Sequence, residues 1–404
     1  MLSDLSRMAF GIMNDYQKEK FKAQNELDLA YGVPGLGRFR VNVFQQRGTI
    51  GVVLRVIPFK ISTIQQLQLP KVLEKIASEQ RGLILVTGTT GSGKSTSLAA
   101  MIDHINTNET CHIMTIEDPI EFLIRDKRSI VNQREVGVDT LSFGQALKSA
   151  LRQDPDVILV GEMRDLETIE TALTAAETGH LVLSTLHTLD ATETISRIIS
   201  VFPPHQQKQV RLQLGSVLRS VVSQRLVPRA DGKGRVAAVE VLVVNGRVRE
   251  MIEDKDRTKE INTAISQSHV TYGMQTFDQS LMMLFRQALI TYEEALRQSS
   301  NPDDFALRVS GISGTSDSSW DGFEKVDEHN TPTQPVQLKP GASSRPPSPA
   351  RGSLGIPTPP PTPSDAAPKL TPPGSRPATS APPPARPSGS PPAAPDDDFQ
   401  IERF

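Results

Sequence analysis

The pattern of apolar and polar positions predicts a mainly parallel sheet in the middle of the chain. Short, continuous apolar runs are separated by stretches long enough to hold a crossover helix, and these runs lie at 82–86, 111–116, 156–160 and 181–185. Strands that are apolar at every position are typical of parallel sheets covered by helices on both faces. The run 236–244 indicates a further strand near the C-terminal edge. Together these elements predict an α/β fold.

A different pattern precedes this region. Residues 39–44 and 50–57 alternate apolar and polar side chains and are rich in β-branched residues, with a turn signal at 46–48. Two such runs joined by a short turn predict an antiparallel strand pair. The segment 58–70 ends at a proline and separates this first domain from the second. Helical patterns are expected at 71–78, 95–106, 206–226, 276–289 and 292–297.

Proline marks a third region at the C-terminal end. Between Pro332 and Pro395 lie 22 of the 31 prolines, accompanied by Ser, Thr, Ala and Gly. Such a segment cannot bury enough apolar surface to offset the entropy of ordering, so we expect it to be extended and disordered. The run 357–363 is typical of a solvated spacer or of a polyproline ligand for an aromatic groove. The acidic and aromatic residues of 396–404 fit either a docking peptide or a solubilising end.

Composition narrows the classes of function. With 44 basic and 46 acidic side chains the formal charge is −2, which provides no general field for nucleic acid. The single cysteine, Cys111, excludes a disulfide framework and a four-cysteine zinc site, and it fits a reducing cytosol. We assign Cys111 no chemistry, because a small apolar strand residue accounts for it. No apolar run approaches the roughly 18 residues that a membrane helix needs, so any membrane contact is expected to be peripheral.

The most informative stretch joins the first apolar run to a phosphate-binding loop. Its residues fill the pattern G-x-x-x-x-G-K-[ST], with an apolar strand before it and a helical pattern after it. In such a loop backbone N–H groups cradle phosphates, the lysine reaches the β- and γ-oxygens, and the serine hydroxyl meets Mg²⁺. The sequence therefore predicts that ATP is held by Gly88, Thr89, Thr90, Gly91, Ser92, Gly93, Lys94, Ser95 and Thr96.

Two carboxylates follow apolar strands and are candidates for the chemistry. Glu117 and Glu162 are each expected at the carboxyl edge of the sheet, where ligands of open α/β sheets bind. Transfer of a phosphoryl group to water needs Mg²⁺ and a group that orients the attacking water. The strand before Glu162 resembles a Walker B strand, but its usual aspartate is replaced by Gly161. We therefore expect Glu162 to hold Mg²⁺ through a water and Glu117 to act as the base.

Histidines offer one further candidate. His187 follows the strand 181–185 among polar residues, at the position expected of a γ-phosphate sensor. For His180, at the start of that strand, a hydrogen bond to the backbone and a functional role remain equal alternatives. A metal cluster of His187 with the two glutamates is rejected, because no two of them share a metal-ligand spacing.

Four segments resemble the conserved boxes of the type II/IV secretion ATPases. The segments 88–96, 115–122, 151–165 and 178–188 are similar, in order and spacing, to the Walker A, Asp, Walker B and His boxes of that superfamily. The strings 272–281 and 300–304 resemble the branch that retracts type IV pili in twitching motility, the PilT and PilU ATPases. This resemblance covers roughly residues 14 to 310.

The resemblance implies a domain plan and an assembly. It implies a shortened N-terminal PAS-like domain at 1–62, a RecA-like ATPase domain at 63–312 and the proline-rich tail at 313–404. It also implies a cytoplasmic homohexamer at the inner membrane that acts on a platform protein of the pilus, with a second retraction ATPase as a further partner. ATP would be closed over by the N-terminal domain of a neighbour, whose Arg40 and Arg55 would stabilise charge on the γ-phosphate.

Two departures from the family pattern keep other functions open. The first domain joins the chain start abruptly, so either the start codon is misassigned or the domain is shortened. The motif implicated in retraction is only partly kept at 246–253. One alternative is therefore a ring subunit that binds ATP and serves as a regulator or adaptor. Another is an assembly ATPase of a secretion or pilus system, which the missing zinc cysteines disfavour.

Overall fold

A small antiparallel sheet forms the first part of the molecule. The structure, a computed structural model, describes residues 2–33 and 37–311. Strands run in the order β1 (Glu26–Val33), β2 (Gly37–Gln46) and β3 (Thr49–Ile57), after helices α1 (Leu2–Gly11) and α2 (Asp15–Gln24). Alternate residues of β1 and β2 are buried, and these are Leu27, Leu29, Val41 and Val43. This period of two gives the sheet one apolar face, against which Phe21 of α2 packs.

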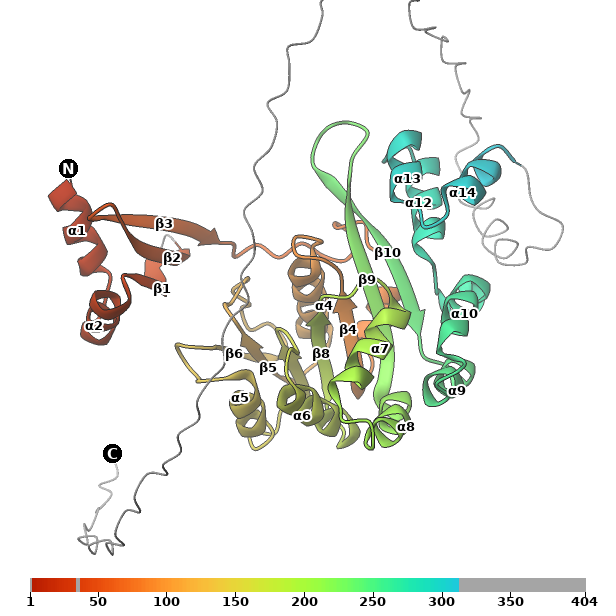
Figure 1. The fold of residues 1–404 in the computed structure, drawn as a ribbon, viewed down its shortest axis with the longest axis horizontal. Helices are drawn as coiled ribbons and strands as arrows, with labels where there is room; N and C mark the ends of the chain where they lie inside the picture. The colour runs from red at the N-terminus through yellow and green to blue at the C-terminus, as the bar shows by residue number, and fades with distance from the viewer. Residues whose placement is uncertain (1, 34–36, 312–404) are drawn as a thin grey trace, which may run out of the picture. The chain divides into compact units, whose positions relative to one another are not determined.

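A seven-stranded sheet forms the centre of the chain (Figure 1). Its order is β10-β9-β4-β8-β7-β5-β6, and every pair is parallel except β9 with β10. The strands are β4 (Gly82–Thr87), β5 (His112–Glu117), β6 (Ile130–Glu135), β7 (Val157–Val160), β8 (Leu181–Leu186), β9 (Leu218–Pro228) and β10 (Arg235–Val243).

Helices cover both faces of this sheet, as Figure 1 shows for α4 and for the group α5 to α8. In β4, Leu83 and Leu85 join the core beneath one set of helices, whereas Ile84 and Val86 join the core on the other face. The side chains on both faces of such a strand pack in an apolar core, which explains its continuous apolar run. The helices are α3 (Val72–Ala77), α4 (Lys94–Asn108), α5 (Phe143–Ala150), α6 (Leu166–Glu177), α7 (Ala191–Val201) and α8 (Gln207–Val217).

A helical segment follows the β9–β10 hairpin. Val227 and Val236 of the hairpin are buried together with Phe277 and Leu281, which makes a third apolar core. The helices of this segment are α9 (Gly246–Glu253), a 3₁₀ turn (Thr258–Glu260), α10 (Ile261–Gln267), α11 (His269–Tyr272), α12 (Phe277–Arg286), α13 (Tyr292–Gln298) and α14 (Pro302–Val309). Among the residues that the structure describes, no helix has the length and apolar character needed to cross a membrane.

The mixed α/β fold predicted from the sequence is confirmed, with corrections to its elements. The strands expected in the centre, the edge strand at 236–244 and the β2–β3 pair are present. The helix expected over 206–226 is wrong in its second half, because α8 ends at Val217 and β9 begins at Leu218. Strands β1 and β6 were not predicted. The predictions for the proline-rich tail lie outside the described residues.

Candidate active site

The phosphate-binding loop lies between β4 and α4, as the sequence predicts. Two of its glycines are required by backbone shape and by close packing against β9. Gly88 has φ +142°, and a Cβ there would lie 2.4 Å from the carbonyl oxygen of Gln224. Gly93 has φ +94°, and a Cβ there would lie 2.6 Å from Nε2 of Gln224. Any larger residue would push the loop away from the strand on which it rests.

Lys94 begins α4 and is buried, with 8% of its surface exposed. Its Nζ donates to the carbonyl oxygens of Gly88 at 2.8 Å and Thr89 at 3.0 Å. Burial lowers the pKa of this ammonium below its usual range, and the carboxylate of Glu162 opposes that shift. The lysine is therefore positioned inside the loop, where it can exchange carbonyl partners for phosphate oxygens.

One cavity of about 650 Å³ collects most of the residues that the sequence singled out. The loop and the start of α4 line it on one side, and the ends of β5, β7 and β8 line it on the other. The predicted residues that line it are Arg40, Arg55, Thr90, Gly91, Gly93, Lys94, Ser95, Thr96, Glu117, Glu162 and His187. The carboxyl edge of the parallel sheet thus brings together side chains that are far apart in the sequence.

Glu117, the last residue of β5, is held by three donors. Its Oε1 accepts from Thr115 Oγ1 at 2.7 Å and from Gln133 Nε2 at 3.1 Å, and its Oε2 accepts from the Glu121 N–H at 3.3 Å. Burial raises the pKa of Glu117 above its usual range, although these hydrogen bonds work in the opposite direction. A fixed carboxylate with a raised pKa is suited to accept a proton from water.

Glu162 lies in a different environment, between two potential cations. Its Oε2 is 2.7 Å from Arg164 Nη2, and its Oε1 is 3.2 Å from His187 Nε2. Burial alone would raise the pKa of Glu162, but the hydrogen bonds and charges of Arg164 and His187 outweigh it and hold the pKa below its usual range. An ionised carboxylate that lines the same cavity as Ser95 is an oxygen donor of the kind that Mg²⁺ prefers.

The oxygen chemistry fits a magnesium ion bound mainly through nucleotide phosphates. Ser95 and Glu162 line the same cavity. Over the described ranges, no three His, Cys, Asp or Glu side chains group closely enough to hold a metal by themselves. Mg²⁺ in nucleotide sites is commonly held by one or two protein oxygens together with waters and phosphates, so this donor set suffices.

Two arginines of the N-terminal sheet reach the same cavity within one chain. Arg40 and Arg55 are directly opposite each other in the β2–β3 register, so they share one face of the strand pair. Like charges in opposed positions destabilise a sheet unless an anion lies between them. Their neighbour Arg38 forms an ion pair with Glu135, with 3.0 Å between Nη2 and Oε2. The expectation that a neighbour's Arg40 and Arg55 complete the site stays a prediction, because the structure describes one chain, in which both arginines line this cavity.

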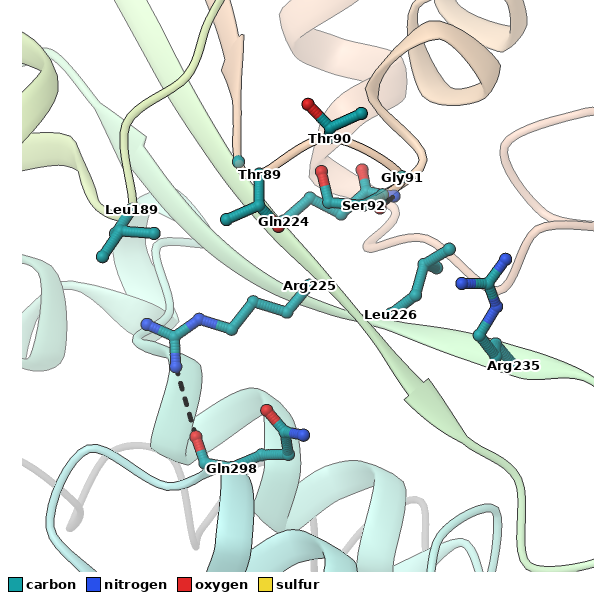
Figure 2. A pocket seen from close by; sticks show the side chains of 11 residues that line it. Thr89, Thr90, Gly91, Ser92, Leu189, Gln224, Arg225, Leu226, Arg235 and Gln298 are labelled. Atoms are coloured by element: carbon teal, nitrogen blue, oxygen red, sulfur yellow. Dashed lines mark hydrogen bonds between the residues drawn. The ribbon is translucent and has the colours of Figure 1, made fainter.

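The remaining loop residues line a second cavity, of about 310 Å³, on the β9 side of the loop (Figure 2). Gly88, Thr89 and Ser92 contribute to this cavity and not to the first, whereas Thr90 and Gly91 line both. Arg225 crosses the view in Figure 2 and donates from Nη1 to the carbonyl oxygen of Gln298 at 3.2 Å.

Comparison with known proteins identifies the family. The sequence model of the family described as "Type II/IV secretion system protein" matches residues 34–297. The chain belongs to this family. It is 48% identical over 304 residues to the twitching motility protein of Neisseria gonorrhoeae, covering 75% of this chain and 81% of that protein. It is 49% identical over 298 residues to the type IV pilus retraction ATPase PilT of Pseudomonas aeruginosa, covering 74% of this chain and 86% of that protein.

A solved structure extends the likeness to three dimensions. The structure described as the pilus retraction motor PilT with bound ADP matches with a TM-score of 0.69 at 49% identity, over 74% of this chain and 84% of that one. The resemblance inferred from the four boxes is confirmed, and the chain is an ATPase of the secretion family.

Several residues of the site escaped the sequence analysis. Thr115 and Gln133 hold Glu117, and Arg164 pairs with Glu162. Arg164 follows Glu162 by two positions within the Walker B segment, so its proximity could have signalled a role. Gln133 lies on β6, a strand that the apolar pattern did not show, and no sequence signal points to it. His180 Nδ1 lies 2.9 Å from the Ala175 carbonyl oxygen, which fits the structural alternative.

Proposed function

We propose that this chain is the motor ATPase that drives type IV pilus retraction, hydrolysing ATP to ADP and phosphate in the cavity of about 650 Å³. The observation that carries the proposal is the convergence of Lys94, Glu117 and Glu162 on that cavity, in a chain with the fold of a retraction motor. The likeness to PilT over most of both chains supports retraction as the output.

In this proposal each site residue has a separate task. The loop from Gly88 to Thr96 binds the phosphates, with Lys94 at the β- and γ-oxygens. Ser95 and Glu162 would hold Mg²⁺, which would supply positive charge to the γ-phosphate. Glu117 orients and deprotonates the attacking water, because its carboxylate is fixed by three donors.

His187 and the two arginines respond to the γ-phosphate. His187 contacts Glu162 from the end of β8, so a change at the metal side reaches the segment that leads into α7. Arg40 and Arg55 supply guanidinium groups that stabilise charge developing on the phosphate. Loss of the γ-phosphate would release these contacts and allow the domains to move.

The proposed assembly is a homohexamer on the cytoplasmic face of the inner membrane. In it, movement of the domains would turn a platform protein at the pilus base, alone or with a second retraction ATPase of the PilU type. Light scattering on the purified chain tests the ring, since a hexamer has six times the mass of the 44.1 kDa chain.

Complementation tests retraction itself. The chain is expressed in a Pseudomonas aeruginosa strain that lacks its own PilT, and the diameter of the twitching zone is measured. We expect the zone to be restored by the wild-type chain and not by Lys94→Ala, because phosphate binding needs the lysine. If the purified chain hydrolyses ATP but does not restore twitching, that result would contradict retraction and favour an adaptor or an assembly ATPase.

A further inference from the structure

Gln224 of β9 contacts the phosphate-binding loop through one end of its carboxamide and α4 through the other. Its Nε2 donates to the carbonyl oxygen of Ser92 at 2.9 Å, and its Oε1 accepts from Ser97 Oγ at 2.7 Å. Only 3% of its surface is exposed. Ser92 belongs to the loop and Ser97 to the first turns of α4. One side chain with a donor and an acceptor therefore joins the loop to its helix.

The contact with Ser92 fixes the direction of a peptide group. In a trans peptide the C=O and the following N–H point in opposite directions. Because the Ser92 carbonyl is held toward β9, the N–H of Gly93 is directed away from β9. Figure 2 shows Gln224 running along the loop beside Ser92. The N–H groups of such loops are the donors that cradle phosphates.

The strand that carries Gln224 is anchored on both sides of this residue. Before it, Ser223 Oγ accepts from Thr87 Oγ1 of β4 at 3.0 Å. After it, the guanidinium carbon of Arg225 lies 4.0 Å from the centre of the Phe277 ring in α12. Gln224 thus lies on a strand that both neighbours hold in place, as a residue that orients a binding element requires.

We propose that Gln224 is a positioning residue for the phosphate-binding loop, which sets the loop so that its N–H groups meet the nucleotide. This inference rests on the proposed hydrolysis of ATP at that loop. Since the loop binds phosphates in the ground state and in the transition state alike, losing its alignment weakens binding more than it slows turnover at saturation.

The test compares Gln224→Met with Gln275→Met in the full-length chain. Gln275 is a matched control, because it is 2% exposed and its Nε2 donates to the Val239 carbonyl oxygen at 2.8 Å, away from the loop. Affinity for fluorescently labelled ADP with Mg²⁺, KM for ATP and kcat are measured, together with the thermal midpoint. For Gln224→Met we expect affinity for labelled ADP to fall about tenfold and KM for ATP to rise about tenfold, with kcat within about threefold of the wild type. For Gln275→Met we expect affinity, KM and kcat to match the wild type.

A second variant keeps the test decisive if Gln224→Met does not fold. Gln224→Glu keeps the acceptor for Ser97 but loses the donor to Ser92, so we expect a loss of affinity of about tenfold as well. The inference is overturned if a folded Gln224 variant binds labelled ADP as the wild type does, or if Gln275→Met loses as much. A wild type that binds ADP but does not hydrolyse ATP would contradict the proposed function instead.

Discussion

At the scale of single residues, the two strand-end glutamates differ in their surroundings, which shift their pKa values in opposite directions. Glu117 accepts only from neutral donors in a buried position, and its pKa is raised by burial. Glu162 lies between Arg164 and His187, and its pKa is held below its usual range. Pairs of carboxyl groups whose environments separate their pKa values commonly take different roles. The division supports Glu117 as the base and Glu162 as the metal-side ligand.

The role of Glu162 predicts a change in the magnesium requirement. Glu162→Gln keeps the shape of the side chain but removes its charge, so we expect the Mg²⁺ concentration for half-maximal turnover to rise about tenfold. Glu167→Gln is the control, because that exposed carboxylate pairs with Lys148 on the surface. Titration of ATP turnover with Mg²⁺ measures both variants, and an unchanged midpoint for Glu162→Gln would remove it from the metal side.

At the scale of elements, the segment after His187 is tied to the edge of the sheet by a buried glutamate. Glu240 of β10 is 2% exposed, and its Oε1 accepts from the N–H of Ala191, the first residue of α7, at 2.9 Å. Burial raises the pKa of Glu240 to about 7, with Asp190 adding to the shift and Arg225, Ser223 and the Ala191 N–H opposing it. The start of α7 is therefore held by a group that titrates near neutrality.

This raised pKa predicts a pH-dependent stability. The folded state binds the proton of Glu240 more tightly than the unfolded state, so the free energy of unfolding falls as the pH rises from about 4.5 to about 7. Glu240→Gln keeps the acceptor for Ala191 and removes the titration. We expect the free energy of unfolding of the variant, relative to that of the wild type, to rise by up to about 3 kcal/mol between pH 4.5 and pH 8. Urea unfolding at both pH values measures this, and two proteins with parallel pH dependence would contradict it.

The elements also show which strands can be predicted from apolar patterns in the sequence and which cannot. Strands β4, β5, β7 and β8 are apolar on both faces, and their continuous runs were found from the sequence. Strand β9 contains several polar residues and follows α8 without a break, so α8 and β9 together were taken for one helix. Edge strand β6 carries polar residues, and only its pairing with β5 defines it.

The site was predictable to the extent that its residues follow strands directly. Glu117, Glu162 and His187 come at or after strand ends, so the geometry of a parallel sheet brings them together. Gln133 and Gln224 act through side chains on neighbouring strands, and strand order cannot be deduced from local patterns. Their contacts became visible only with the register of the folded sheet.

At the scale of the whole molecule, residues of the N-terminal sheet and of the ATPase core line one cavity. Arg40 and Arg55 line the cavity that also holds the loop, and Arg38 pairs with Glu135. Hydrolysis at such a junction changes the charge between two parts of the chain, which gives a motor a means of moving one against the other. The proposed motor function requires that ATP is hydrolysed in this cavity with Glu117 as the base.

Steady-state ATP turnover of the wild type and of Glu117→Gln tests that claim most directly. We expect the wild type to turn over ATP with Mg²⁺, and the variant to lose at least about 100-fold in kcat while its affinity for labelled ADP stays within about threefold. That combination would show a base that acts in the chemical step and not in binding. Equal turnover by the two proteins, or a wild type that binds nucleotide without hydrolysing it, would contradict the account.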